Sequence, residues 1–125
     1  SKEYRKEKKE YLKPLELAHT IVDALEEKKG ENILLLDLQK VAMFTDFFVI
    51  CSGTSDRMLD ALADGAENAA REKHAVKGQR EGQPASGWVV VDFGQVIVHL
   101  FAPEVRDYYK LEDLWREGRI LLRLQ

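Results

Sequence analysis

The spacing of apolar residues predicts a helix followed by two strands. From residue 15, apolar side chains recur every three or four positions, which places them on one face of a helix that Pro14 begins and Gly30 ends. Segments 32–38 and 46–52 are apolar runs of strand length, rich in β-branched and aromatic residues. Gly53 ends the second run, so we expect two strands before this glycine.

A hydroxyl side chain after Gly53 indicates the start of a second helix. Thr54 or Ser55 can cap it, and an apolar stripe at helical spacing continues to about His74. We then expect a short strand at 75–77. The segment from 78 to 87 contains three glycines and a proline, so it predicts a loop.

The most regular strand pattern surrounds Gly94. Segments 88–92 and 95–101 alternate as strands do, and the glycine between them supplies the geometry of a hairpin turn. Both faces of the second strand are apolar, Val96, Val98 and Leu100 on one and Ile97, His99 and Phe101 on the other. Helices on both sides of the sheet would explain this pattern, and so would a partner-binding surface on one side.

The end of the chain predicts one more helix and an apolar tail. Pro103 is typical of a helix start, and an aromatic-rich segment follows it as far as Gly118. The order of elements predicts an α/β fold, a single domain with a mixed β-sheet of about five strands flanked by helices. We divide the chain into a charged extension (1–14), a folded domain (15–118) and an apolar tail (119–125) that packs on or pairs with another segment.

Composition and charge narrow the functional classes. The chain is 45% hydrophobic and 33% charged, and it lacks a run of roughly 20 apolar residues, so we expect a cytoplasmic or organelle-matrix protein without a membrane contact. Residues 1–13 contain six basic and three acidic side chains, which leaves thirteen basic and nineteen acidic in the remainder. This acidic body predicts little direct contact with nucleic acid. We interpret the basic extension as a solvated helix, with an RNA-binding arm as the alternative.

The residues that could carry catalysis lack the partners they need. The start of the helix at Gly53–Asp56 could hold a phosphate on its backbone N–H groups, so a nucleotide-binding or nucleotidyltransferase-like enzyme is the alternative function. Such an enzyme needs paired carboxylates to hold magnesium. Asp37 is followed two residues later by Gln39, and Asp92 by Gly94, so neither strand offers that pair.

The cysteine and the histidines suggest no other chemistry. Cys51 is the single cysteine, and we expect it to pack as a buried strand residue. The histidines at 19, 74 and 99 have no metal-ligand spacing, and His99 on its apolar strand is the one of interest. We therefore expect a protein that is not an enzyme, with no catalytic residue, no cofactor and no metal.

Four segments in order resemble the RsfS/Iojap family over about residues 15–116. They are 45–55 (TDFFVICSGTS), 87–94 (GWVVVDFG), 96–101 (VIVHLF), and Arg106 with 109–115 (YKLEDLW). The resemblance implies a sheet flanked by helices with a nucleotidyltransferase-like shape but without the catalytic carboxylates. It also implies a ribosomal silencing factor, a repressor of translation.

The family's role implies a partner and a set of contact residues. The resemblance implies binding to the large ribosomal subunit through ribosomal protein L-fourteen, which sterically blocks association of the small subunit. A homodimer would also be in keeping with it. Carried over by position, the expected contact residues are Trp88, Asp92, His99, Phe101, Tyr108, Tyr109 and Trp115. Trp88 is the expected anchor, because buried tryptophans dominate interface energies.

Overall fold

Strand β2 (Phe47–Ser52) forms the centre of the sheet, and all six of its residues are buried. It pairs in parallel with β5 (Val96–Phe101) on one side and antiparallel with β1 (Glu31–Asp37) on the other. The full strand order is β3-β4-β5-β2-β1-β6. The predicted α/β class and mixed sheet are confirmed, although the sheet has six strands and not about five.

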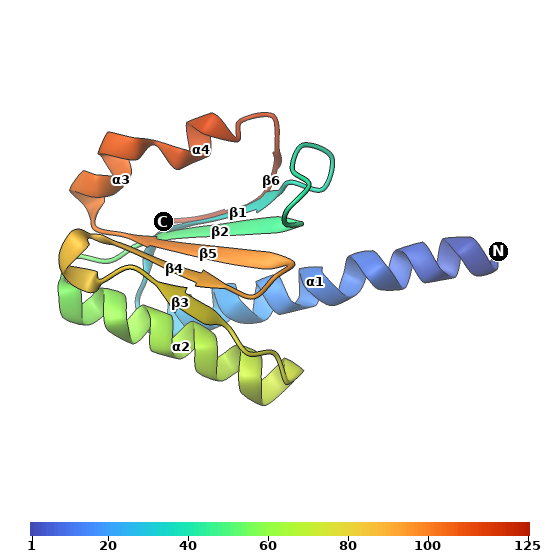
Figure 1. The fold of residues 1–125 in the computed structure, drawn as a ribbon, viewed down its shortest axis with the longest axis horizontal. Helices are drawn as coiled ribbons and strands as arrows, with labels where there is room; N and C mark the ends of the chain where they lie inside the picture. Colours follow the sequence, from blue (N-terminus) through green and yellow to red (C-terminus); the bar gives the residue numbers. More distant parts are fainter.

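The computed structural model describes the backbone of residues 1–125 and the side chains of all of them except residues 9 and 10. The remaining elements are α1 (Lys2–Glu27), α2 (Asp56–His74), β3 (Gln79–Glu81), the short 3-10 helix η1 (Pro84–Ser86), β4 (Trp88–Asp92), α3 (Pro103–Tyr109), α4 (Leu111–Leu114) and β6 (Arg119–Leu124). Helices α1 and α2 cover one face of the sheet, and α3 and α4 lie over the other (Figure 1). None of the described helices combines the length and hydrophobicity that crossing a membrane requires.

The two faces of the sheet have separate hydrophobic cores. Alternating residues of the strands, such as Val49 and Val98, pack with Ile21 and Leu62 of α1 and α2 in the larger core. The smaller core lies on the opposite face and consists of Leu34, Leu36, Leu38, Phe48, Ile50, Phe101 and Leu111. The second layer of helices is short, so it leaves part of its face of the sheet open.

Helix α1 begins at Lys2, so the interpretation of the basic extension as a helix is confirmed, but the expectation that Pro14 begins the helix of the folded domain was wrong. Proline interrupts the hydrogen bonding of a helix interior, and tertiary contacts offset that cost here. The ring of Tyr11, before the proline, packs on Phe47 with 6.0 Å between centroids. The hydroxyl of Ser1 accepts a hydrogen bond from the Tyr4 N–H at 3.1 Å. The helix extends past the sheet at its N-terminal end (Figure 1), and a separate 1–14 unit stays a prediction.

The C-terminal tail pairs with the sheet, as its apolar residues predicted. Strand β6 runs antiparallel to β1, with Leu122 opposite Leu35 and an irregularity between Leu35 and Leu36. This pairing makes β6 an edge strand, and the bulge is a common device at such edges.

Strand β3 was not predicted. We expected a strand at 75–77 and a loop from 78 to 87, but Ala75 ends α2 in a left-handed conformation (φ 55°) and residues 79–81 pair with β4. Arg80 holds this short strand against α2. Its guanidinium lies 2.7 Å from Asp60, 2.6 Å from Asp64 and 2.8 Å from Glu67. The hydrogen bond that Arg80 donates to the Glu67 carboxylate is the main reason that the pKa of Arg80 lies above its usual range.

Arg80→Met should lower the free energy of unfolding by about 1 kcal/mol, because three carboxylates of α2 lose their shared cation. The loss should shrink in 1 M salt, where exposed charges are screened. Urea unfolding at low and high salt measures both effects. Arg57→Met, on an exposed position of the same helix, makes the same change in net charge and is the control. Equal losses in the two variants would contradict the role of Arg80.

Candidate partner-binding surface

Eight aromatic rings form one connected network on the α3–α4 face of the sheet, among the side chains that the structure describes. Neighbouring rings have centroids 4.5 to 6.2 Å apart. The members of this aromatic network are Phe44, Phe48, Trp88, His99, Phe101, Tyr108, Tyr109 and Trp115. Its rings come from the loop before β2, from three strands, from α3 and from the turn after α4, so no single segment of the sequence forms it.

Six of the seven predicted contact residues belong to the aromatic network. Tyr108 and Tyr109 are 80% and 48% exposed, whereas Phe101 is fully buried and His99 is 7% exposed. The tyrosines are therefore accessible to a partner, while Phe101 and His99 support the surface from beneath. The seventh residue, Asp92, lies apart at the turn of the hairpin, where its Oδ1 accepts a hydrogen bond from the Gly94 N–H at 2.7 Å.

Trp88 is half-buried at the centre of the exposed part of the network. Its ring lies 4.9 Å from Phe101 and 4.8 Å from Tyr109, measured between centroids. Gly87 makes this placement possible, because its φ is +76° and an added Cβ would lie only 2.6 Å from Val105 of α3. The glycine thus allows α3 to lie directly against the start of β4.

His99 is joined to Trp88 by a hydrogen bond. The indole Nε1–H donates to Nδ1 of His99 at 3.2 Å. Burial lowers the pKa of His99 to about 4, so the ring is neutral at physiological pH. Nδ1 is therefore paired, whereas the buried Nε2 has no hydrogen-bond partner among the described residues. The hydrogen-bond partner of His99 is thus neither a carboxylate nor a nucleophile.

The sequence reasoning missed two of the eight members of the aromatic network, Phe44 and Phe48. Phe48 lies 4.5 Å from His99 and 5.8 Å from Trp115, and Phe44 extends the network into the loop before β2. One signal was available. Because side chains of a strand alternate, the neighbouring Phe47 and Phe48 must lie on opposite faces of the sheet. The loop also exposes Met43 fully and Phe44 by 58%, which no spacing pattern indicated.

Arg106 fixes the short helices over the sheet. Its Nη1 donates to the carbonyl of Asn32 at 2.7 Å and to the hydroxyl of Ser52 at 2.9 Å. Its Nη2 lies 3.0 Å from Glu112. One side chain of α3 therefore connects the ends of β1 and β2 with α4. The left-handed Lys110 (φ 47°) separates the two helices.

The start of α2 is a helix cap. The hydroxyl of Ser55 accepts a hydrogen bond from the Met58 N–H at 3.1 Å, as the cap interpretation predicted. Cys51 is fully buried, and burial raises the pKa of its thiol to about 12, so it packs as predicted. In the part of the chain that the structure describes, no three His, Cys, Asp or Glu side chains form a group able to hold a metal ion.

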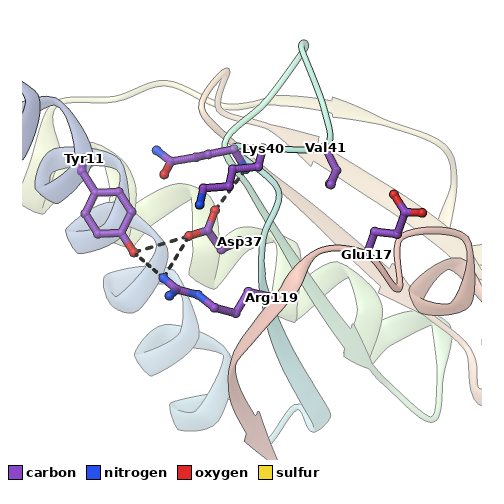
Figure 2. A pocket seen from close by; sticks show the side chains of 7 residues that line it. Tyr11, Asp37, Lys40, Val41, Glu117 and Arg119 are labelled. Atoms are coloured by element: carbon purple, nitrogen blue, oxygen red, sulfur yellow. Dashed lines mark hydrogen bonds and ion pairs between the residues drawn. The ribbon is translucent and has the colours of Figure 1, made fainter.

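A polar pocket of about 280 Å³ lies at the opposite end of the strands, between α1, β1 and β6 (Figure 2). Asp37 lies in its centre and accepts hydrogen bonds from Tyr11 at 3.5 Å and Arg119 at 3.4 Å. Burial, together with the nearby Asp37 carboxylate, raises the pKa of Asp46 beside it. Tyr11, Asp37 and Arg119 bind one another, so this part of the pocket is a junction between α1, β1 and β6.

Arg106→Met should lower the free energy of unfolding by about 2 kcal/mol, because the carbonyl, hydroxyl and carboxylate it contacts lose a buried charged donor. Amide hydrogen exchange in α3 and α4 should accelerate more than in α2. Arg106→Lys keeps the charge but not the planar fork, so its effect should be intermediate. Unchanged protection of α3 and α4 in Arg106→Met would refute this role.

Stability should fall as the pH is lowered from about 6.5 to about 4. The folded pKa of His99 is about 4 and its ordinary value is 6.5, so the unfolded chain binds more protons in this window. Neutral His99 therefore stabilises the fold fully above pH 6.5. Denaturant unfolding at several pH values, compared with His99→Asn, isolates this contribution from other titrating groups. If the free energy of unfolding depended on pH in the same way for the wild type and His99→Asn, the contribution of His99 would be contradicted.

Comparisons with known proteins find relatives that are named as ribosomal silencing factors. Residues 11–123 match the family described as "Ribosomal silencing factor during starvation". The chain is 36% identical to "Ribosomal silencing factor RsfS" of Halalkalibacterium halodurans over 103 residues, which cover 82% of this chain and 88% of that protein. It is 36% identical over 100 residues to the mouse "Mitochondrial assembly of ribosomal large subunit protein 1", covering 76% of this chain and 43% of the mouse protein.

The fold agrees with these relatives. A crystal structure of a protein from Chromobacterium violaceum superimposes with a TM-score of 0.78 and 36% sequence identity, covering 82% of this chain and 85% of that one. Proteins named as ribosomal silencing factors are regulators, so the prediction of a protein that is not an enzyme is confirmed. The chain belongs to the RsfS family of ribosomal silencing factors.

Proposed function

We propose that this chain represses translation by binding the large ribosomal subunit through ribosomal protein L-fourteen, where it sterically blocks association of the small subunit. Membership of the family supports a ribosomal role, and the mouse relative is named for assembly of the large ribosomal subunit. Blocking of this kind requires occupancy and no turnover. A specific interface that would provide it buries about 800 Å² on each partner.

The exposed part of the aromatic network is the observation that carries this proposal. Tyr108, Tyr109 and the half-buried Trp88 lie together over β4 and α3. Leu114 on α4 is 74% exposed close by in the chain. Aromatic side chains that are accessible but held by their neighbours are typical of interface anchors. Trp88 is the proposed anchor, with the two tyrosines beside it.

The other predicted contact residues have different roles in this proposal. Phe101 and His99 support the ring of Trp88 from the sheet. Trp115 packs on Phe48 at 5.8 Å and extends the surface towards the loop before β2. Asp92 lies at the far end of the hairpin, where it would contact only the margin of a partner.

The charge of the surface favours a basic protein partner. Residues 103–117, which include α3 and α4, contain five acidic and three basic side chains, and Arg106 among the basic ones is paired with Glu112. The whole of residues 14–125 contains nineteen acidic and thirteen basic side chains. Ribosomal proteins are usually basic, and opposite charge accelerates encounter. The same acidic body supports little direct contact with ribosomal RNA.

The place of action follows from the partner. We propose that the chain acts where ribosomes are assembled and used, in the bacterial cytoplasm or an organelle matrix. A homodimer that forms through exposed sheet or tail surface is part of the same proposal.

Trp88→Ala should weaken binding to isolated large subunits by at least about 2 kcal/mol, roughly 30-fold, because an anchor of the interface is removed. Co-sedimentation with large subunits gives the affinity, and sucrose gradients after adding small subunits show whether joining is still blocked. Tyr4→Ala is the matched control, since Tyr4 is an exposed aromatic residue (63%) on α1, away from the aromatic network.

Both variants should unfold cooperatively, and Trp88→Ala should melt at a lower temperature than Tyr4→Ala because it loses its packing on Phe101 and Tyr109. Wild-type affinity of Trp88→Ala would refute Trp88 as the anchor. Failure of the wild-type protein to sediment with large subunits, or to prevent subunit joining, would refute the proposed function itself.

A further inference from the structure

Within the aromatic network, one hydrogen bond joins the side chains of Trp88 on β4 and His99 on β5. The two residues lie on neighbouring antiparallel strands and on the same face, because Trp88 is opposite Phe101 and His99 is opposite Val90. They are therefore diagonal neighbours, a separation that long side chains can bridge. The indole Nε1–H bridges it and donates to Nδ1 of His99 at 3.2 Å.

This hydrogen bond determines which tautomer His99 adopts. A nitrogen that accepts a hydrogen bond carries no proton, so the neutral ring carries its proton on Nε2. That nitrogen is buried and has no hydrogen-bond partner among the described side chains and backbone. The protein thus leaves one buried donor of His99 unpaired in order to satisfy the donor of Trp88. A buried unpaired donor costs free energy, which makes a purely structural role a poor reason for this histidine.

The hydrogen bond also decides what Trp88 offers to a partner. Nε1 is the only polar atom of an indole, and here it is directed into the sheet. Phe101 at 4.9 Å and Tyr109 at 4.8 Å hold the ring from other sides. The part of the indole that stays accessible is therefore carbon alone. A complementary pocket on the partner needs apolar contacts and no hydrogen-bond acceptor.

We propose that His99 is a positioning residue, which holds the indole of Trp88 in one orientation and directs its apolar edge towards a pocket of the protein partner that lacks an acceptor. This inference rests on the proposed function, since it concerns how the anchor is presented. The benefit is preorganisation, because a side chain already fixed in its bound orientation loses less conformational entropy on docking.

Three substitutions of His99 separate positioning from packing. Asparagine and leucine have the same branched shape, but only asparagine places an acceptor close to the position of Nδ1. Glutamine has an acceptor too, but its longer chain places it near the position of Nε2, away from Trp88. The readouts are the ¹⁵N–¹H resonance of the Trp88 indole, recognised by its loss in Trp88→Phe, and the affinity for isolated large subunits.

We expect His99→Asn to keep the hydrogen-bonded indole resonance and an affinity within about threefold of the wild type. His99→Leu and His99→Gln should shift the resonance towards that of a free indole and weaken binding about tenfold, the effect of one lost hydrogen bond that orients a contact. Melting temperatures of the three variants show how much each loses in stability. If His99→Leu does not fold, the comparison of His99→Asn with His99→Gln still tests the positioning role.

Different results would refute the positioning role of His99 and the proposed function. Equal affinities for the asparagine, glutamine and leucine variants would overturn the positioning role, and so would losses of affinity that follow the losses of stability. If Trp88→Ala weakens binding in the same assay, the proposed function survives that result. If Trp88→Ala binds like the wild type, the anchor itself is refuted, while the indole resonances still report whether His99 orients Trp88.

Discussion

The parallel pairing of β2 with β5 at the centre of the sheet is the constraint on which the rest of the structure depends. Every residue of β2 is buried, so both of its faces need a covering layer. Helices α1 and α2 provide a complete layer on one side, with Leu25 and Leu62 fully buried. The other layer consists of the short α3 and α4. It leaves Trp88 of the sheet half-buried and carries the exposed Tyr108 and Tyr109 on α3, and these side chains form the surface on which the proposed function rests.

An incomplete layer has to be held in place by specific contacts, because it buries little apolar area. Leu111 packs into the smaller core, and Arg106 connects α3 to Asn32, Ser52 and Glu112. The guanidinium can donate to all of these acceptors only when each lies in the right direction, so few alternative positions of α3 and α4 are allowed. This rigidity suits a protein that acts by occupying space, because a surface that is fixed before binding loses less entropy when it docks.

The aromatic network combines support and recognition in one set of side chains. Its buried members, Phe101 and His99, pack against the half-buried Trp88, which in turn packs against the exposed Tyr109. The fully exposed Met43 and the exposed Phe44 extend the apolar area along the loop before β2. The absence of paired carboxylates on the strands, which already argued against nucleotidyl transfer, agrees with the non-enzymatic character of the family.

The sequence by itself determined the features whose signals lie within a few residues of one another. The hairpin around Gly94, the Ser55 cap and the Pro103 helix start are set by turn and cap chemistry, and each is present in the structure. The family resemblance then implied seven contact residues, and the structure brings six of them together in the aromatic network. Tertiary structure decided the rest, because pairing with a distant segment leaves no local pattern. Strand β6 forms by pairing with β1, and the ion pairs of Arg80 hold β3 against α2. The part of α1 before Pro14 is held by the packing of Tyr11 against Phe47. The bond from Trp88 to His99 likewise exists only because the register of β4 and β5 places the two rings on one face.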